Sequence, residues 1–195
     1  MQSPKNKAIF FDRDGVVNLR IVGEYVQSYD DFRFCPDFFK FFKFIKSQGY
    51  LAVIITNQQG LGKGIMNEDD LNIIHDKMQI DIENATGFRF DDIFYCGSLS
   101  TQRCERRKPN PGMILEAVAK WNIDKNYSWI IGDSLSDIIA GEKAEIGTIY
   151  LGQHLANPFI NPNFQFRNFQ QLEEQFKDII DFAPPFIKPY DGLEV

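Results

Sequence analysis

Short apolar runs alternate with longer helix-like segments along this chain. The runs at residues 8–11 and 51–55 are continuously apolar, which is typical of strands buried on both faces of a parallel sheet. Strands that alternate with helices in this way form βαβ units. We therefore predict an α/β fold, a doubly wound, Rossmann-like parallel sheet with helices on both faces. Its strands are expected at residues 8–11, 51–55, 93–95, 129–131 and 148–151.

Local signals mark the ends of the helices between these strands. Asn67 is a good N-cap for a segment with an acidic first turn, and Gly49 follows a segment that it can terminate. Asn110-Pro111 is typical of an N-cap followed by proline at the first helical position. Helices are expected at residues 37–48, 68–85, 111–121 and 135–143, and residues 152–195 should add a C-terminal strand, a helix near 169–182 and an extended tail at Pro184-Pro185.

Five phenylalanines fall within one of these helices. They could line an exposed binding groove, or they could form the buried face of an amphipathic helix. Phe38, Phe41 and Phe42 recur at helical spacing, which favours the buried face. We predict that these rings belong to the core and that Lys40 and Lys43 face water.

Length and composition limit the class of protein. The chain has 195 residues, 44% of them hydrophobic, which is enough for one domain with its own core. We expect a single domain over residues 1–195 with its core at about 7–151. The net charge of −6 argues against nucleic acid or an anionic membrane as partner. No segment resembles a signal peptide or membrane span, and the chain has only three cysteines, so we expect a cytoplasmic protein, which we take to be a monomer.

Polar residues follow three of the predicted strands at the point where each strand ends. Ligands of open α/β sheets bind beyond these carboxyl ends, so the three groups should meet at one edge of the sheet. A basic cluster ahead of the 111–121 helix should join them. The residues concerned are Asp12-Arg13-Asp14-Gly15, Thr56-Asn57-Gln58, Gly132-Asp133-Ser134 with Asp137, and Arg106-Arg107-Lys108.

The carboxylates in these groups favour metal-assisted transfer of a phosphoryl group. Three carboxylates from two strand ends repel one another unless a cation lies between them, and oxygen ligands suit Mg²⁺. Asp12 leaves its strand first, where its position is best fixed, so we predict that it attacks phosphorus as the nucleophile. Asp14 would protonate the leaving alkoxide and then activate water, a role that requires a raised pKa.

The remaining polar residues would neutralise the charge of the transferring phosphoryl group. Thr56 offers a hydroxyl, Asn57 an amide and Lys108 a positive charge. Asp133 would complete the ligands of the metal, and Asp137 would either bind it through water or hold Lys108. Each of these residues taken singly could be a helix cap or a surface residue. The prediction therefore depends on their joint occurrence, in this order, at the ends of the strands.

These motifs resemble those of the haloacid dehalogenase superfamily of phosphatases, over about residues 7–151. The four matching motifs, in order, are Phe10-Phe11-Asp12-Arg13-Asp14-Gly15-Val16-Val17-Asn18, Thr56-Asn57-Gln58, Lys108, and Gly132-Asp133 with Asp137. The resemblance implies that Asp12 is the nucleophile and Asp14 the acid/base. It also implies that Mg²⁺ is held by the Asp12 carboxylate, the Asp14 backbone carbonyl and Asp133.

Finer details resemble one subgroup, the D-glycero-D-manno-heptose 1,7-bisphosphate phosphatases, to which histidinol-phosphate phosphatases are closely related. The details are Asp-Arg-Asp-Gly-Val-Val-Asn from Asp12, Tyr25-Val26, Thr56-Asn57-Gln58-Gln59-Gly60, and Arg107-Lys108-Pro109-Asn110-Pro111-Gly112-Met113. The subgroup has no large cap domain, and this chain has no room for one. The resemblance implies that Arg107, Gln58 and the loop at 60–63 contact the sugar phosphate.

The chain departs from these relatives at their zinc loop, which often reads Cys-x-His and Cys-x-Cys. Here the two segments read Cys96-Gly97-Ser98 and Cys104-Glu105-Arg106, so two of the four ligands are missing. Neither His75 nor His154 is placed to replace them. A structural zinc site normally needs four nitrogen or sulfur ligands. We expect no zinc, and whether the two cysteines form a disulfide stays open.

Several functions remain possible at this level. The best single prediction is Mg²⁺-dependent hydrolysis of D-glycero-D-manno-heptose 1,7-bisphosphate at its 7-phosphate, and the alternative enzyme is a histidinol-phosphate phosphatase. A non-catalytic phosphosugar-binding domain would be expected to have lost a residue such as Asp12 or Asp133, and both are present. A dinucleotide-binding domain would need a glycine-rich first turn. The glycines at 60–64 follow the second strand instead, and we expect a flexible loop there.

Overall fold

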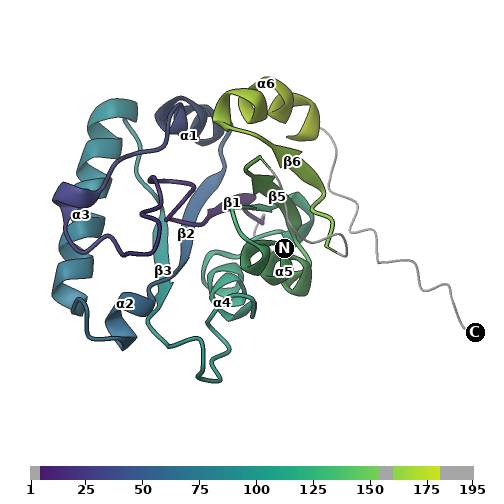
Figure 1. Cartoon of the computed structure of the whole chain (residues 1–195). Coiled ribbons are helices and arrows are strands. Elements are labelled where there is room, and N and C mark those ends of the chain that lie inside the picture. Colours follow the sequence, from purple (N-terminus) through teal and green to yellow (C-terminus); the bar gives the residue numbers. More distant parts are fainter. Residues whose placement is uncertain (1–4, 154–159, 181–195) are drawn as a thin grey trace, which may run out of the picture.

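The computed structural model describes residues 5–153 and 160–180, and Figure 1 shows their arrangement. The predicted tail at Pro184-Pro185, the last two residues of the predicted C-terminal helix and His154 lie outside the described residues. Within the described ranges, no helix is both long enough and apolar enough to cross a bilayer.

Six parallel strands form one sheet in the order β3-β2-β1-β4-β5-β6. This order confirms the predicted doubly wound, Rossmann-like sheet. The five predicted strands are all present, each within two residues of its expected bounds, and the C-terminal strand is only three residues long. The strands are β1 (Ala8–Phe11), β2 (Leu51–Asn57), β3 (Asp92–Cys96), β4 (Trp129–Gly132), β5 (Gly147–Leu151) and β6 (Phe164–Phe166).

Helices cover both faces of the sheet (Figure 1). Alternate residues of β1 point to opposite faces, so Phe11 packs with the helices of one layer and Phe10 with those of the other. The first layer consists of α1 (Phe38–Ser47), α3 (Glu68–Thr86) and α6 (Phe169–Ile180), and the second of α4 (Gly112–Trp121) and α5 (Leu135–Ala144). Short helical turns occur at η1 (Tyr29–Asp31), α2 (Gln59–Gly62) and η2 (Lys125–Tyr127).

Two local predictions need correction. The glycine-rich segment expected to be a flexible loop begins as α2, where Gly62 lies so close to the Gly97 carbonyl that a Cβ would overlap it. Helix α4 begins at Gly112 and has Pro111 as its N-cap. This start is one residue later than the Asn110-Pro111 signal predicts. Helix boundaries of this kind commonly shift by a residue or two, and neither change alters the topology.

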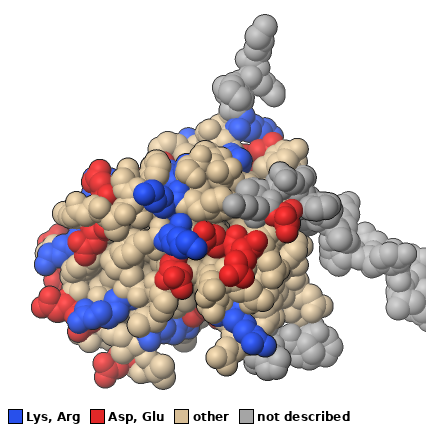
Figure 2. Space-filling view, turned by 90° about the horizontal axis from the view of Figure 1, so that it is seen from above, with Lys and Arg blue, Asp and Glu red and all other residues tan. Residues whose placement is uncertain are grey.

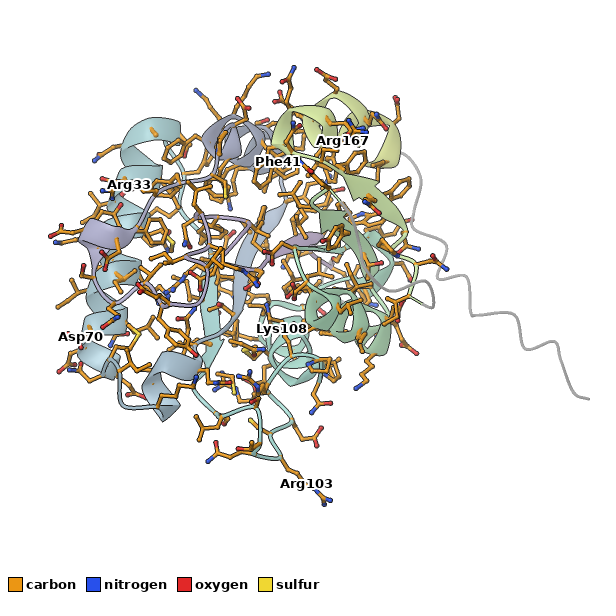
Figure 3. The ribbon with its side chains drawn as sticks, viewed as in Figure 1. Arg33, Phe41, Asp70, Arg103, Lys108 and Arg167 are labelled. Carbon is orange, nitrogen blue, oxygen red and sulfur yellow. The ribbon has the colours of Figure 1, made fainter. Side chains whose placement is uncertain are left out.

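The phenylalanines of α1 form the centre of the larger core, as predicted. Phe38, Phe41 and Phe42 are fully buried, and their ring centroids lie 6.2–6.4 Å from that of Phe11 on β1. Phe41 also meets two rings of α6, at centroid distances of 5.3 Å, and Figure 3 shows it between the two helices. One helix thus joins the sheet to the C-terminal helix.

We predict that Phe41→Ala lowers the free energy of unfolding by about 3–5 kcal/mol, because it leaves a cavity between α1, α6 and β1. Lys43→Ala on the exposed side of the same helix should change it by no more than about 0.5 kcal/mol. Urea unfolding of both variants measures the difference. Equal effects would mean that the rings of α1 are not core.

Candidate active site

The topology brings two acidic strand ends side by side. β1 and β4 are neighbours in register, with Phe11 opposite Ile131, and the Asp12 N–H donates to the Ile131 carbonyl at 3.0 Å. The helices that follow these strands, α1 and α5, belong to opposite layers. The chain therefore diverges after Asp12 and after Gly132, and this switch point is where α/β sheets place their ligands.

Lys108 is the buried cation of this edge, and Figure 3 shows it near the middle of the molecule. Its side chain is 2% exposed, and its ammonium nitrogen lies 2.9 Å from Asp12 Oδ1 and 2.5 Å from Asp137 Oδ1. It also donates to the Ile55 carbonyl at 2.7 Å. Of the two roles left open for Asp137, the geometry favours holding Lys108.

The backbone of Lys108 is fixed by Asn57. The Asn57 side-chain amide donates to the Lys108 carbonyl at 2.9 Å, and its oxygen accepts from the Lys108 N–H at 3.0 Å. Asn57 therefore links the end of β2 to the segment that carries the lysine. It was predicted to bind phosphate through its amide, and in this geometry one proton of that amide is used to position Lys108.

Asp14 is surrounded by hydrogen-bond donors. Its carboxylate accepts from Arg13 at 3.0 and 3.1 Å, from Asn18 at 3.0 Å and from Gln58 at 2.9 Å. Burial raises the pKa of Asp14, but the Arg13 charge and the hydrogen bonds outweigh burial and leave the pKa below its ordinary value. The raised pKa expected from sequence is not found, because the neighbour that dominates is an arginine.

Gln58 and Thr56 form one hydrogen-bonded pair beside Asp14. The Gln58 amide nitrogen donates both to Asp14 and, at 2.9 Å, to the Thr56 hydroxyl oxygen. Both side chains are buried. The Thr56 hydroxyl proton remains available for a further acceptor, in keeping with its predicted role, whereas Gln58 uses both amide protons within the protein.

Arg13 was predicted to lie at this edge but was given no role, and His75 was not predicted as part of the site. Arg13 is 1% exposed, and its guanidinium lies 3.3 Å from His75 Nε2 as well as against Asp14. Burial and the Arg13 charge lower the pKa of His75 to about 3, so the ring is neutral and can accept a hydrogen bond. His75 lies on the buried face of α3, between Ile74 and Met78 in sequence, and that placement was the available signal.

A cluster of three carboxylates completes the edge of the sheet. Asp12, Asp133 and Asp137 each contribute an oxygen, and these atoms all lie within 4.8 Å of one another. Burial raises the pKa of Asp12 to about 6, and burial together with the Asp12 charge raises that of Asp133 to about 7. Like charges this close require a cation, and a set made only of oxygen donors fits Mg²⁺.

Gly15 makes this cluster possible. Its φ is +100°, and a Cβ at this position would overlap the Asp133 carboxylate. Only glycine therefore lets the turn after β1 lie against the residue that ends β4. Gly87, at the C-terminus of α3, has a similar φ of +79°, but a Cβ there would meet open space. This position favours glycine only because of its backbone conformation.

A cavity of about 440 Å³ opens onto these residues. Asp12, Asp14, Asn57, Gln58 and Lys108 are among the residues that line it. Arg107, predicted to contact substrate, is not one of them: its guanidinium donates to the Ser98 carbonyl at 2.8 Å and to the Gln59 side chain at 3.0 Å. The structure thus brings these predicted site residues to one cavity but places Arg107 in the neighbouring loop.

Cys96, the last residue of β3, and Cys104 of the 97–107 loop lie close together. Cys96 Sγ and Cys104 Sγ are 3.5 Å apart, while Ser98 and Arg106 take the positions where a four-ligand loop would offer further donors. A hydrogen bond with Ser98 contributes most to lowering the pKa of Cys104 to about 7. His75 faces Arg13 instead, as described above, so it does not serve this loop.

Comparison with known proteins agrees with this geometry. Residues 70–151 match the family model of haloacid dehalogenase-like hydrolases. The heptose-1,7-bisphosphate 7-phosphatase of Rhodopseudomonas palustris is 38% identical over 74% of this chain and 82% of its own length. That of Campylobacter jejuni is also 38% identical, over 87% and 94%. This chain is a phosphatase of the haloacid dehalogenase-like hydrolase family.

A solved structure supports the same assignment of the phosphatase. The D,D-heptose 1,7-bisphosphate phosphatase of B. bronchiseptica, complexed with magnesium and phosphate, superimposes with a TM-score of 0.82 at 28% identity. The match covers 89% of this chain and 99% of that one. The phosphatase therefore shares most of its architecture with that protein, and the absence of a large cap among the described residues agrees with the sequence prediction.

We predict that Gly15→Ala weakens Mg²⁺ binding at least about tenfold, because a Cβ forces the Asp133 carboxylate out of the cluster. Gly87→Ala is the matched control, since it imposes the same backbone strain of about 1 kcal/mol with no side chain in its way. Isothermal titration with Mg²⁺ measures both. Unchanged affinity in Gly15→Ala would show that Asp133 is not held where the structure has it.

Proposed function

We propose that this phosphatase hydrolyses D-glycero-D-manno-heptose 1,7-bisphosphate at its 7-phosphate, with Mg²⁺ as cofactor. The observation that carries the mechanism is the position of Asp12, which contacts the buried ammonium of Lys108, itself paired with Asp137, and which shares a carboxylate cluster with Asp133. The substrate is inferred from the names of the relatives, which are heptose bisphosphate phosphatases.

In the proposed first half of the reaction, a carboxylate oxygen of Asp12 attacks phosphorus and the bond from phosphorus to the sugar oxygen breaks. Asp14, whose pKa lies below its ordinary value in this structure, would have to take up a proton once substrate is bound. It would then give that proton to the leaving alkoxide, so that an aspartyl phosphate and a free hydroxyl result. Bound Mg²⁺ would be held by the Asp12 carboxylate, the Asp14 carbonyl and Asp133, and it would supply positive charge opposite Lys108.

In the second half, water attacks the phosphorus of the aspartyl phosphate and Asp14 takes its proton. Inorganic phosphate leaves and the Asp12 carboxylate is restored. The hydrogen bonds from Arg13, Asn18 and Gln58 hold the Asp14 carboxylate in one orientation for both steps. Fixing the orientation of an acid/base group in this way is a large part of what an active site contributes to the rate.

Lys108 and Thr56 are the proposed partners of the phosphoryl oxygens. The ammonium already lies 2.9 Å from Asp12, so a phosphoryl group on that residue would be within its reach. The Thr56 hydroxyl proton has no acceptor among its described contacts. Arg107 and Asn57 stay proposed substrate contacts, and the former would first have to release Ser98 and Gln59.

We also propose that the chain acts as one domain over residues 1–195, with its core at about 7–151, and as a cytoplasmic monomer. Its acidic net charge supports a small-molecule substrate over nucleic acid. On the face shown in Figure 2, basic and acidic side chains lie intermixed, which supports the same proposal. All the residues proposed for the reaction come from one chain.

The decisive test is phosphate release with Mg²⁺ from heptose bisphosphates of both anomers, hexose bisphosphates and histidinol phosphate. Heptose bisphosphate should have the highest kcat/KM. Asp12→Asn should lower kcat by about 10³-fold or more, because an amide cannot attack phosphorus. Asp69→Asn, an exposed site on α3, should retain full activity. A preference for histidinol phosphate would overturn the substrate, and full turnover by Asp12→Asn would overturn the mechanism.

We propose further that Cys96 and the 97–107 loop hold no structural zinc, because Ser98 and Arg106 stand where the zinc loop implied by the family resemblance would have two of its four ligands. Protein purified without chelators should contain well under about 0.1 zinc per chain by elemental analysis, as expected of a site with only two thiolates. One zinc per chain that is lost in a Cys96→Ser, Cys104→Ser double variant would show that the proposal is wrong.

A further inference from the structure

We propose that Arg20 is a built-in cation that occupies the metal position in the metal-free protein and must move away before Mg²⁺ binds. Arg20 lies in the loop that follows Asn18 and was not part of the predicted site. The inference rests on the metal site proposed above and concerns the equilibrium that controls loading of that site, which is separate from the choice of substrate.

The contacts of Arg20 are with the three groups proposed to hold the metal. One guanidinium nitrogen lies 2.6 Å from Asp133 Oδ1, donates to the Asp14 carbonyl at 3.1 Å and lies 3.9 Å from Asp12 Oδ2. The carboxylate directly after β1, a carbonyl of the following turn and the carboxylate directly after β4 thus converge on one nitrogen. The other guanidinium groups of residues 5–153 and 160–180 form ion pairs with at most one carboxylate residue each.

The other cations of the site have different partners. The Arg13 guanidinium contacts the Asp14 carboxylate and His75 through its two terminal nitrogens, and its buried Nε has no partner among the described residues. Lys108 lies on the far side of Asp12, at Oδ1, and pairs with Asp137. Among the ion pairs of the described residues, Arg20 is the sole cationic partner of Asp133. If the Arg20 guanidinium left and no other cation took its place, no cation would lie between the Asp133 and Asp12 carboxylates.

Charge balance supports exchange over simultaneous binding. The carboxylates of Asp12, Asp133 and Asp137 and the ammonium of Lys108 leave a formal charge of −2. Arg20 halves this charge, and Mg²⁺ cancels it. With both cations present the cluster would carry a net positive charge at short range, and the two would compete for the same oxygen atoms. One cation should therefore replace the other.

The loop is built so that Arg20 can leave. Its base is fixed, because Asn18 is fully buried and donates to Asp14, and the Leu19 N–H donates to the Arg33 carbonyl at 2.7 Å. Ile21 packs against the core, and the next three residues, 22–24, are exposed to solvent, with Val22 93% exposed. The Arg20 side chain itself is 48% exposed, so the guanidinium can swing into water with little loss of packing.

The competition predicts a measurable change in affinity. A half-exposed ion pair contributes modestly, so Arg20→Gln should tighten Mg²⁺ binding by about three- to tenfold in isothermal titration of metal-free protein without substrate. Arg33→Gln is the matched control: it removes one positive charge from an arginine that donates to carbonyl groups, away from the carboxylates. It should leave the affinity within about twofold of the wild type, since surface changes of this kind have small effects. Affinity unchanged or weakened in Arg20→Gln would overturn the proposal.

A second measurement follows the side chain directly. Arginine modification by a dicarbonyl reagent, read by mass spectrometry, should be faster at Arg20 in Mg²⁺ than in EDTA, because the metal releases the guanidinium. Arg103, which Figure 3 shows pointing away from the tip of its loop, should react equally in both. Equal rates at Arg20 in the two buffers would contradict displacement.

These experiments separate the two proposals. Asp133→Asn should abolish the Mg²⁺ titration signal, and wild-type protein that gives no such signal would refute the metal site itself together with the role of Arg20. Wild-type protein that binds Mg²⁺ but releases no phosphate from any heptose bisphosphate would refute the proposed substrate. It would leave the exchange of Arg20 for Mg²⁺ standing.

Discussion

The buried ammonium of Lys108 is the interaction on which the acidic edge of the sheet depends. Asp12 and Asp137 are each less than one-tenth exposed, and two carboxylates at such depth would otherwise repel one another and lose their hydration. The ammonium lies between them and is itself fixed by the Ile55 carbonyl. The end of β1, the strand β2, the first turn of α5 and the segment that carries Lys108 must therefore meet at one point before any of these charges can be buried.

The same requirement explains how the loops around Lys108 are built. Asn57 clamps the Lys108 backbone from both sides, so the end of β2 determines where the ammonium lies. Arg107, the next residue back, is held by Ser98 and Gln59. Hydrogen bonds thus connect this loop to the site. The chain lacks two of the four residues that a structural zinc would need there. Polar contacts of Arg107 therefore position this loop next to the site.

Charge and packing are separated within the fold. The phenylalanines of α1 and the strand residue Phe11 bury apolar surface on one face of the sheet, and the titratable groups gather at its carboxyl edge. Crowded carboxylates lower stability, so a site of this kind needs a rigid core that does not depend on it. Arg20 and Mg²⁺ then become alternative ways of relieving the same repulsion, one supplied by the chain and one by the solvent.

Much of this protein could be predicted from sequence because its signals are local. Continuous apolar runs determined the strands, and polar residues directly after Phe11, Ile55 and Ile131 indicated which edge carries the chemistry. Parallel strands place their carboxyl ends together, so Asp12, Thr56 and Asp133 had to be neighbours. The phosphatase class followed from residue types and order alone.

Only the tertiary structure determined the properties that depend on contacts between residues far apart in the sequence. The pKa of Asp14 is set by Arg13, whose own partner His75 comes from a helix about sixty residues away. Whether Asp137 held Lys108, and whether Arg107 reached the cavity, depended on side-chain directions that no spacing encodes. Arg20 was an unremarked loop residue in the sequence, and only the folded chain brings its guanidinium onto the oxygens of Asp12, Asp14 and Asp133. Local sequence patterns determine which charged groups lie at an edge of the sheet. The Coulomb energy between these groups depends on the distances between them, and only the tertiary structure determines those distances.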